Sequence, residues 1–181
     1  ALGTMGVGEG GPELVKQLLK NTWDITPPEV VLCYVTGKPK KGIGPHDVAI
    51  ALVKETFGQG LVKNKVLEFA GPGLEYLPYD FRSGIDVMTT ETTCLSSIWA
   101  TDEEIKKYYE IHKRPECYKK LEPKEGAYYD AIITIELDKM EAMIALPFHP
   151  SNAYTIHEFL ENADEILAGV EAEAAKKFPK D

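Results

Sequence analysis

The chain has 181 residues, of which 44% are hydrophobic and 27% charged, and its formal net charge is −9. This length suits one domain, or one domain with an appendage, and the composition is that of a folded globular protein. The negative charge argues against general nucleic-acid binding, because phosphates would repel the chain. No apolar run approaches the roughly 20 residues that a membrane helix needs, so we expect no membrane partner.

The three cysteines, Cys33, Cys94 and Cys117, are an odd number with wide spacing and no C-x-x-C pair. We therefore expect no disulfide framework, a reducing cytoplasmic location and no metal site built from these residues alone. The sequence starts at Ala1 inside a glycine-rich segment and shows no export signal. This start predicts a fragment of a larger protein.

The first half of the chain alternates between helical and extended patterns. After the glycine-rich residues 1–11, a helix is predicted over 12–21, with its apolar residues on one face. The run VVLCYVT does not alternate, which predicts a strand covered on both faces. The clearest helix is predicted up to Phe57, with Gly58 following its end, and a short strand is expected at 65–71.

The second half continues the alternation. We predict, in order, a helix ending near Met88, a β-rich run at 92–99, a helix with Thr101 as N-cap, a strand at 128–137 and an extended piece at 143–147. The tail from about Thr155 is predicted to be one amphipathic helix. Alternating strands and helices favour an α/β layered domain with a largely parallel sheet, over residues 1–154, followed by a helical tail or linker at 155–181.

Gly6, Gly8 and Gly11 match G-x-G-x-x-G and precede a predicted helix. A dinucleotide site would need a strand before this loop and an acid after the second strand. Only five residues precede Gly6, and the second strand ends in YVTG without an acid. We interpret the segment as a tight loop that enters a helix, and keep a nucleotide-binding module as an alternative.

Histidines and arginines give no clear site. His46, His112, His149 and His157 are scattered, and none forms the i, i+4 pair of a helical metal site. The arginines show no clamp pattern. We therefore interpret all of these side chains as structural or solvated.

Two short stretches are better candidates. EFAGPG, residues 68–73, places Gly71 and Gly73 directly after a strand, where ligand crevices open in α/β sheets; an ordinary turn is the alternative. DVMTTETTCLSS, residues 86–97, holds Glu91 among threonines and serines. The threonine hydroxyls can donate hydrogen bonds to an ionised carboxylate, which suits an acid used for proton transfer. A solvated turn residue is the alternative for Glu91.

Six segments, taken together, resemble the aconitase and isopropylmalate-isomerase family. They are GVGEGGPELV, VVLCYVTGKPKKGIGPHDVAIAL, KNKVLEFAGPG, GIDVMTTETT, EGAYYDAIITIEL and MIALPFHPSN, spread over roughly residues 1–154. The resemblance implies a three-layer α/β/α fold like that of the family's iron–sulfur domains. It also implies a hydratase that acts on a small hydroxy-carboxylic acid with a [4Fe-4S] cluster.

The resemblance implies site residues as well. The family's Met-x-x-Glu carboxylate falls on Glu91, where it is expected to pair with a histidine that assists the departing hydroxyl. Val87, Thr90, Gly71 and Gly73 become candidates for lining the substrate cleft. Where the family usually has an asparagine, four residues before the glutamate, this chain has Val87, which cannot form that hydrogen bond.

Further departures concern the cluster. The family's Asp-Ser-His segment would lie before Ala1, and its three cluster cysteines would lie beyond Asp181. We therefore expect this chain to bind no cluster itself and to act with the remaining domains of a parent chain, contributing one wall of the cleft. A homologue that has lost catalysis and kept a binding or regulatory role is the alternative, motivated by Val87.

Overall fold

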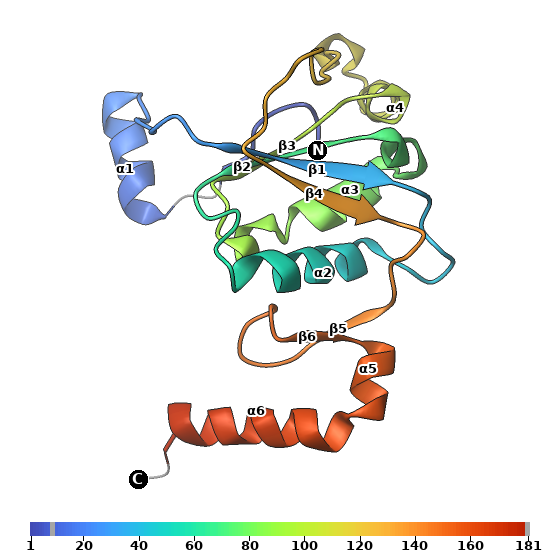
Figure 1. Ribbon diagram of the computed structural model, residues 1–181. Helices are drawn as coiled ribbons and strands as arrows, with labels where there is room; N and C mark the ends of the chain where they lie inside the picture. Colours follow the sequence, from blue (N-terminus) through green and yellow to red (C-terminus); the bar gives the residue numbers. More distant parts are fainter. Residues whose placement is uncertain (8–9, 180–181) are drawn as a thin grey trace.

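A four-stranded parallel sheet organises the chain, whose computed structural model describes residues 1–7 and 10–179. The strand order is β3-β2-β1-β4, with helices beside the sheet (Figure 1). The strands are the apolar and β-branched runs expected to form them: β1 (Val30–Thr36), β2 (Val66–Ala70), β3 (Ser96–Trp99) and β4 (Ala131–Glu136). The predicted α/β class with a parallel sheet is confirmed.

Helices alternate with these strands, as the sequence pattern predicts. The α-helices are α1 (Gly11–Lys20), α2 (Pro45–Phe57), α3 (Tyr79–Asp86), α4 (Glu103–Ile111), α5 (Ile156–Glu161) and α6 (Ala163–Lys177). Short 3-10 helices are η1 (Pro72–Tyr76), η2 (Thr89–Thr92) and η3 (Pro115–Cys117). No helix in the described part of the chain is long and apolar enough to cross a membrane.

The core lies between the sheet and helices α2 and α3, which cover the same face (Figure 1). Parallel register aligns Val31 with Leu67 and Cys33 with Phe69, so these side chains point to that face together. All four are fully buried. Phe69 also stacks on Trp99 of β3, with ring centroids 4.0 Å apart. This packing holds the strands, and therefore the loops at their two ends, in place relative to α2 and α3.

The opposite face of the sheet is more open. Burial alternates along β1, and Tyr34 keeps 41% of its surface exposed. Ile132 of β4, on the same face, is 64% exposed. The expectation that residues 30–36 are covered on both faces is therefore wrong for β1. An apolar run shows that a strand can be buried, but a neighbouring element must still cover it.

Helix α4 begins one residue later than predicted. Asp102, not Thr101, is its N-cap, and its carboxylate accepts hydrogen bonds from the backbone N–H groups of Glu104 and Ile105. The hydroxyl of Thr101 instead donates to the carbonyl oxygen of Lys119 at 2.8 Å. Both residue types can cap a helix, so the sequence alone does not decide between neighbours.

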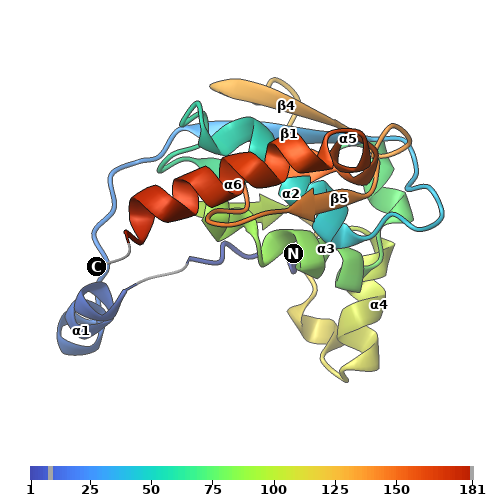
Figure 2. The ribbon, with the colours of Figure 1, turned by 90° about the horizontal axis from the view of Figure 1, so that it is seen from below.

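A hairpin precedes the tail, and the tail itself forms two helices. Strands β5 (Met143–Ala145) and β6 (Ala153–Thr155) pair antiparallel, and Figure 2 shows them beside α2. Thr155 caps α5 through a reciprocal capping box with Glu158. The prediction of a single tail helix is wrong, because Asn162 leaves the helical conformation and its side chain donates to the Glu158 carbonyl.

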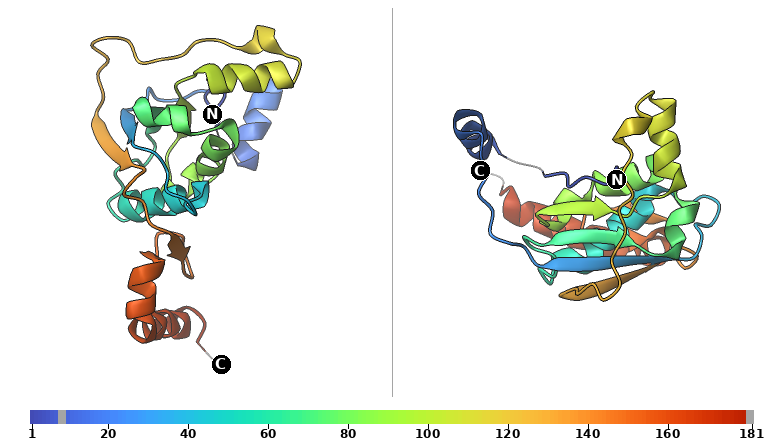
Figure 3. Two further views of the ribbon diagram at one scale, coloured as in Figure 1. Left: turned by 90° about the vertical axis from the view of Figure 1, so that its right-hand side faces the viewer. Right: turned by 90° about the horizontal axis from the view of Figure 1, so that it is seen from above.

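Helix α1 stands apart from the sheet (Figure 3). It forms where predicted, with Pro12 in its first turn, but it buries none of its residues. Leu18 and Leu19 on its apolar face are 81% and 78% exposed. The apolar face predicted for this helix is therefore present but not covered by the described residues.

Candidate active site around Glu91

Glu91 lies in η2, at the edge of the sheet where the strands begin. The turn leads directly into β3, and the Leu95 N–H donates to the carbonyl oxygen of Lys65, the residue before β2. The Glu91 side chain keeps 48% of its surface exposed. The carboxylate is therefore neither a core residue nor fully solvated.

The neighbouring threonines do not hydrogen-bond to the carboxylate, contrary to the sequence-based expectation. The hydroxyl of Thr89 donates to the carbonyl oxygen of Asp86 at 2.8 Å, and that of Thr92 donates to the carbonyl oxygen of Thr89 at 2.6 Å. In a tight helical turn, the backbone carbonyl three residues earlier lies within reach of such a hydroxyl. The threonines thus stabilise the turn that carries Glu91.

The partner of Glu91 is His149. Its Nε2 lies 3.9 Å from Oε2 of Glu91, and its side chain is 35% exposed. The ring of His149 stacks on Phe57, at the end of α2, with centroids 3.8 Å apart. His149 is therefore a packed loop residue, which agrees with the structural interpretation of the histidines, and it also faces Glu91. It lies in PFHPSN, the last of the six resembling segments, and that context was the signal available in the sequence.

The loop that carries His149 is held by its own hydrogen bonds. The backbone N–H of Ser151 donates to Nδ1 of His149 at 3.1 Å, and the Ser151 hydroxyl oxygen lies 2.9 Å from the same nitrogen. The Asn152 side chain donates to the carbonyl oxygen of Pro147 at 2.7 Å. Both ring nitrogens of His149 therefore face a defined partner, one in the loop and one in η2.

Val87 and Thr90 line a shallow cavity of about 410 Å³, whose lining includes neither Glu91 nor His149. Val87, the residue after α3, is 66% exposed. The cavity also contains Asp86, which accepts hydrogen bonds from the Ser97 hydroxyl and from Nε1 of Trp99 at 2.9 Å. These bonds tie the end of α3 to β3. Two of the predicted cleft residues thus lie close in sequence and space to Glu91.

Gly71 and Gly73 lie at the opposite edge of the sheet, after β2 ends. A Cβ on Gly71 would lie 2.5 Å from the carbonyl oxygen of Val35, and one on Gly73 would lie 2.9 Å from a Val35 methyl group. Close packing against β1 therefore accounts for both glycines. The structure does not bring them together with Glu91, because the strands are parallel and separate the two edges.

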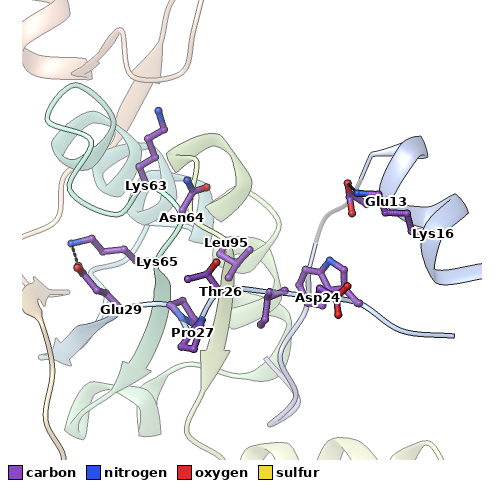
Figure 4. A pocket seen from close by; sticks show the side chains of 13 residues that line it. Glu13, Lys16, Asp24, Thr26, Pro27, Glu29, Lys63, Asn64, Lys65 and Leu95 are labelled. Atoms are coloured by element: carbon purple, nitrogen blue, oxygen red, sulfur yellow. Dashed lines mark hydrogen bonds and ion pairs between the residues drawn. The ribbon is translucent and has the colours of Figure 1, made fainter. Parts of the chain in front are cut away.

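A larger groove of about 680 Å³ lies between α1 and the starts of the strands (Figure 4). Two ion pairs join charged residues of its lining, Lys16 with Glu13 and Lys65 with Glu29. None of the predicted site residues lines it. The groove is therefore separate from the Glu91 pair.

The cysteines of this chain do not fit a [4Fe-4S] cluster. Thiolates are the cluster ligands, and burial raises the pKa of the Cys33 thiol far above its usual range. Burial also raises the pKa of Cys94. Cys117 lies apart in η3. Within residues 1–7 and 10–179, no three His, Cys, Asp or Glu side chains gather as a metal site.

The glycine-rich start does not have the arrangement of a dinucleotide loop. Gly6 forms an isolated antiparallel bridge with Ser97, and the described residues contain no strand ahead of α1. Gly8 lies outside the described residues. A dinucleotide-binding loop also requires its helix to pack on the sheet, and α1 buries no residue.

Comparison with known proteins places the chain in a family. A family model described as the aconitase family (aconitate hydratase) matches residues 1–180. The chain belongs to the aconitase family. The match of this aconitase-family chain extends beyond residue 154, where the resemblance was expected to end, and into the helical tail.

Individual relatives carry hydro-lyase and isomerase names. The chain is 30% identical over 173 residues to the 3-isopropylmalate dehydratase large subunit of Campylobacter fetus, covering 93% of this chain and 41% of that protein. It is 30% identical over 142 residues to the same subunit of Picrophilus torridus, covering 78% and 34%. It is 29% identical over 196 residues to phosphinomethylmalate isomerase of Streptomyces viridochromogenes, covering 98% and 22%. The chain thus spans about two fifths or less of these proteins.

Proposed function

We propose that this chain is part of an aconitase-family hydro-lyase that acts on a small hydroxy-carboxylic acid, with Glu91 as a catalytic carboxylate. The observation that carries the proposal is the half-exposed Glu91 facing His149, while Thr90, the residue before Glu91, lines the same cavity as Val87. Family membership and the dehydratase names of the relatives support this reaction class.

The chemistry suits a paired carboxylate. Removing water from a hydroxy acid breaks one C–H and one C–O bond and forms a C=C bond. The proton passes to a base, and the hydroxyl group leaves as water after accepting a proton. A half-exposed carboxylate that is not committed to the core can take part in such proton transfers. Glu91 supplies one of these groups, and the others come from outside this chain.

The rest of the proposal concerns partners. The complete protein binds a [4Fe-4S] cluster through ligands in its remaining domains, and this chain forms one wall of the cleft between them. The short coverage of the relatives supports additional domains. We propose a cytoplasmic protein that has no nucleic-acid or membrane partner, consistent with the charge of −9.

The test is to replace Glu91 with glutamine in the complete protein that contains this chain. Hydration and dehydration of aconitate-like and isopropylmalate-like acids are measured at saturating substrate. We expect kcat to fall by about 100-fold or more, the usual contribution of general acid–base catalysis. The matched control is Glu161→Gln, which alters an exposed histidine–glutamate pair on α5. Wild-type turnover by Glu91→Gln would exclude the proposed role.

A second candidate is a homologue without catalysis that retains a binding or regulatory role. The observation that favours it is Val87, whose exposed isopropyl group stands at the cavity where the family usually has an amide. The same assays decide between the two candidates. Turnover of any of these acids by the complete wild-type protein rules out the second candidate. Binding of an acid without turnover supports it.

A further inference from the structure

We propose that Asp86 is a positioning residue for Glu91, because its carboxylate ties the end of α3 to β3 and closes the base of the turn that carries Glu91. This inference rests on the proposed function, since it takes Glu91 as the catalytic group. It gives a role to a second acid, which acts through Glu91 and needs no contact with the substrate.

The helix that ends in Asp86 does not itself explain an acid at this position. Asp86 is the last residue of α3, and the partial negative charge of a helix C-terminus disfavours a carboxylate. The side chain is 24% exposed, so water screens only part of this repulsion. Donors from outside the helix therefore have to stabilise the charge.

Two of these donors lie on β3. The Ser97 hydroxyl and Nε1 of Trp99, the latter at 2.9 Å, both donate to Oδ1 of Asp86. Residues two apart on a strand point to the same face, so one carboxylate oxygen can accept from both. Oδ2 pairs with the Ala1 ammonium group at 3.0 Å. Both oxygens are thus held, and Oδ1 is held by the strand that follows the turn.

The two donors on β3 are part of the core. Trp99 is fully buried and stacks on Phe69 of β2, and Ser97 is 5% exposed. Hydrogen bonds from such donors to a charged acceptor are stronger than bonds between neutral groups. Asp86 therefore joins the end of α3 to a closely packed part of the sheet.

The turn is anchored on both sides of Glu91. On one side, the carbonyl oxygen of Asp86 accepts from the Thr89 hydroxyl at 2.8 Å. On the other side, the carbonyl oxygen of Thr93 accepts from the backbone N–H of Asn64 at 3.0 Å. Of these two anchors, only the first passes through Asp86. Loosening it would let Glu91 turn away from a substrate while the sheet stays folded.

Two neighbouring serines separate positioning from stability. Ser96 and Ser97 are both buried in β3, at 3% and 5% exposure. The Ser96 hydroxyl donates to the carbonyl oxygen of Gly6 at 2.6 Å, whereas the Ser97 hydroxyl donates to Asp86. Alanine at either position removes a hydrogen bond of similar burial, but only Ser97→Ala loosens the anchor of the turn.

The first experiment measures amide hydrogen exchange in the 181-residue chain by NMR. The Glu91 N–H donates to the carbonyl oxygen of Met88 at 3.1 Å, so its exchange rate reports opening of the turn. We expect Ser97→Ala to speed exchange at Glu91 about fivefold or more relative to Ser96→Ala. The amide of Leu67, in the core, should respond equally to both variants. Equal rates at Glu91 in the two variants would overturn the inference.

The second experiment measures turnover by the complete protein. Asp86→Ala removes the anchor, so kcat should fall roughly 10- to 100-fold while KM changes little, because a misplaced catalytic group lowers the rate rather than the binding. Asp86→Asn keeps an acceptor oxygen for Ser97 and Trp99 and should recover most of that loss. Ser97→Ala should lower kcat by a smaller factor, and Ser96→Ala should leave it unchanged. Equal losses for Asp86→Ala and Asp86→Asn, or equal kcat in the two serine variants, would reject a positioning role.

The two proposals fail in different ways. If Glu91→Gln loses activity while Asp86→Ala and Ser97→Ala keep it, the proposed function stands and this inference is wrong. If Glu91→Gln itself retains activity, the proposed function fails, whatever the exchange rates of the turn show. The serine pair decides the test where Asp86→Ala does not fold.

Discussion

The two edges of the parallel sheet carry residues that differ in how deeply they are buried. At the carboxyl edge, Gly71 and Gly73 pack against β1, and the fully buried Arg82 fills the space between the turn and the start of α4. At the amino edge, Glu91 and His149 face each other with a third to a half of their surfaces exposed. The closely packed glycines and Arg82 lie at one edge, and the partly exposed Glu91–His149 pair lies at the other.

This difference qualifies a common rule. Ligand crevices in α/β sheets open at the carboxyl ends of the strands, which made Gly71 and Gly73 candidates. Here steric contact with Val35 already explains both glycines. A paired carboxylate that no packing demand explains is the stronger indication of chemistry. If the comparison holds, substitutions at the carboxyl edge should reduce stability, and those at Glu91 or His149 should reduce activity.

The largest stability effect is expected for Arg82→Met. The guanidinium donates to the carbonyl oxygens of Leu74 and Leu77 at 2.8 and 2.9 Å, and it pairs with Asp102, the N-cap of α4. Removing it leaves buried carbonyls and a carboxylate without their donor, so we expect a loss of about 3–5 kcal/mol in the free energy of unfolding. Urea unfolding followed by circular dichroism measures this loss.

The matched control for Arg82 is an ion pair at the amino edge. Lys65 pairs with Glu29, and its side chain is 26% exposed. Lys65→Met should therefore cost no more than about 1 kcal/mol. Equal losses for the two variants would mean that the edges do not differ in the way described.

Gly71→Ala is expected to have the next largest effect. Gly71 has φ +118°, and a Cβ there would lie 2.5 Å from the carbonyl oxygen of Val35. Backbone strain and this clash together should cost about 2–3 kcal/mol in urea unfolding. Gly126 separates the two causes, because it has φ +76° with open space around it. Gly126→Ala should cost only about 1 kcal/mol, and a similar cost for both would remove the role of the clash.

Much of this fold could be predicted from the sequence. Local patterns predict the positions of β1, β4 and α2 correctly. These patterns are the β-branched runs of the two strands and the helical spacing and end signal of α2. The break at Asn162 and the open face at Tyr34 were missed. The first depends on which of several polar residues leaves the helix, and the second on whether another element covers the strand. Neither is encoded in a short pattern.

The site was predicted only in part. Glu91 could be proposed because its segment resembles a family motif. His149 could not, because it lies 58 residues further along the chain in a loop, and only the fold brings it to η2. Arg82 could be interpreted from the sequence only as structural or solvated, because a structural arginine is recognised by the carbonyl groups it reaches. Long-range partners of this kind require the three-dimensional structure.

A smaller effect is expected for Tyr129→Phe, next to the start of β4. Burial, together with the hydrogen bond to Glu68 at 3.0 Å, raises the pKa of Tyr129 to about 12. Losing this hydrogen bond should cost about 1 kcal/mol at neutral pH. Since the pKa is raised in the folded state, the stabilisation is present below pH 10 and declines as the pH rises towards 12.

Urea unfolding of wild type and Tyr129→Phe at several pH values checks this prediction. The difference between the two proteins should stay constant up to about pH 10, the usual tyrosine pKa, and then shrink. A difference that grows above pH 10 would mean that the hydroxyl favours its ionised form in the folded protein. Tyr128→Phe is a suitable control, since Tyr128 is 82% exposed.

The smallest effect on stability is expected for Glu91→Gln. Its carboxylate is half-exposed, and its interaction with His149 spans 3.9 Å, so the free energy of unfolding should change by no more than about 0.5 kcal/mol. Urea unfolding of the 181-residue chain measures this change, with Glu161→Gln as the matched exposed variant. A loss above about 2 kcal/mol would show that Glu91 is needed to hold η2 in place. Any loss of activity in Glu91→Gln would then reflect folding, and the amino edge would be structural in the same sense as the carboxyl edge.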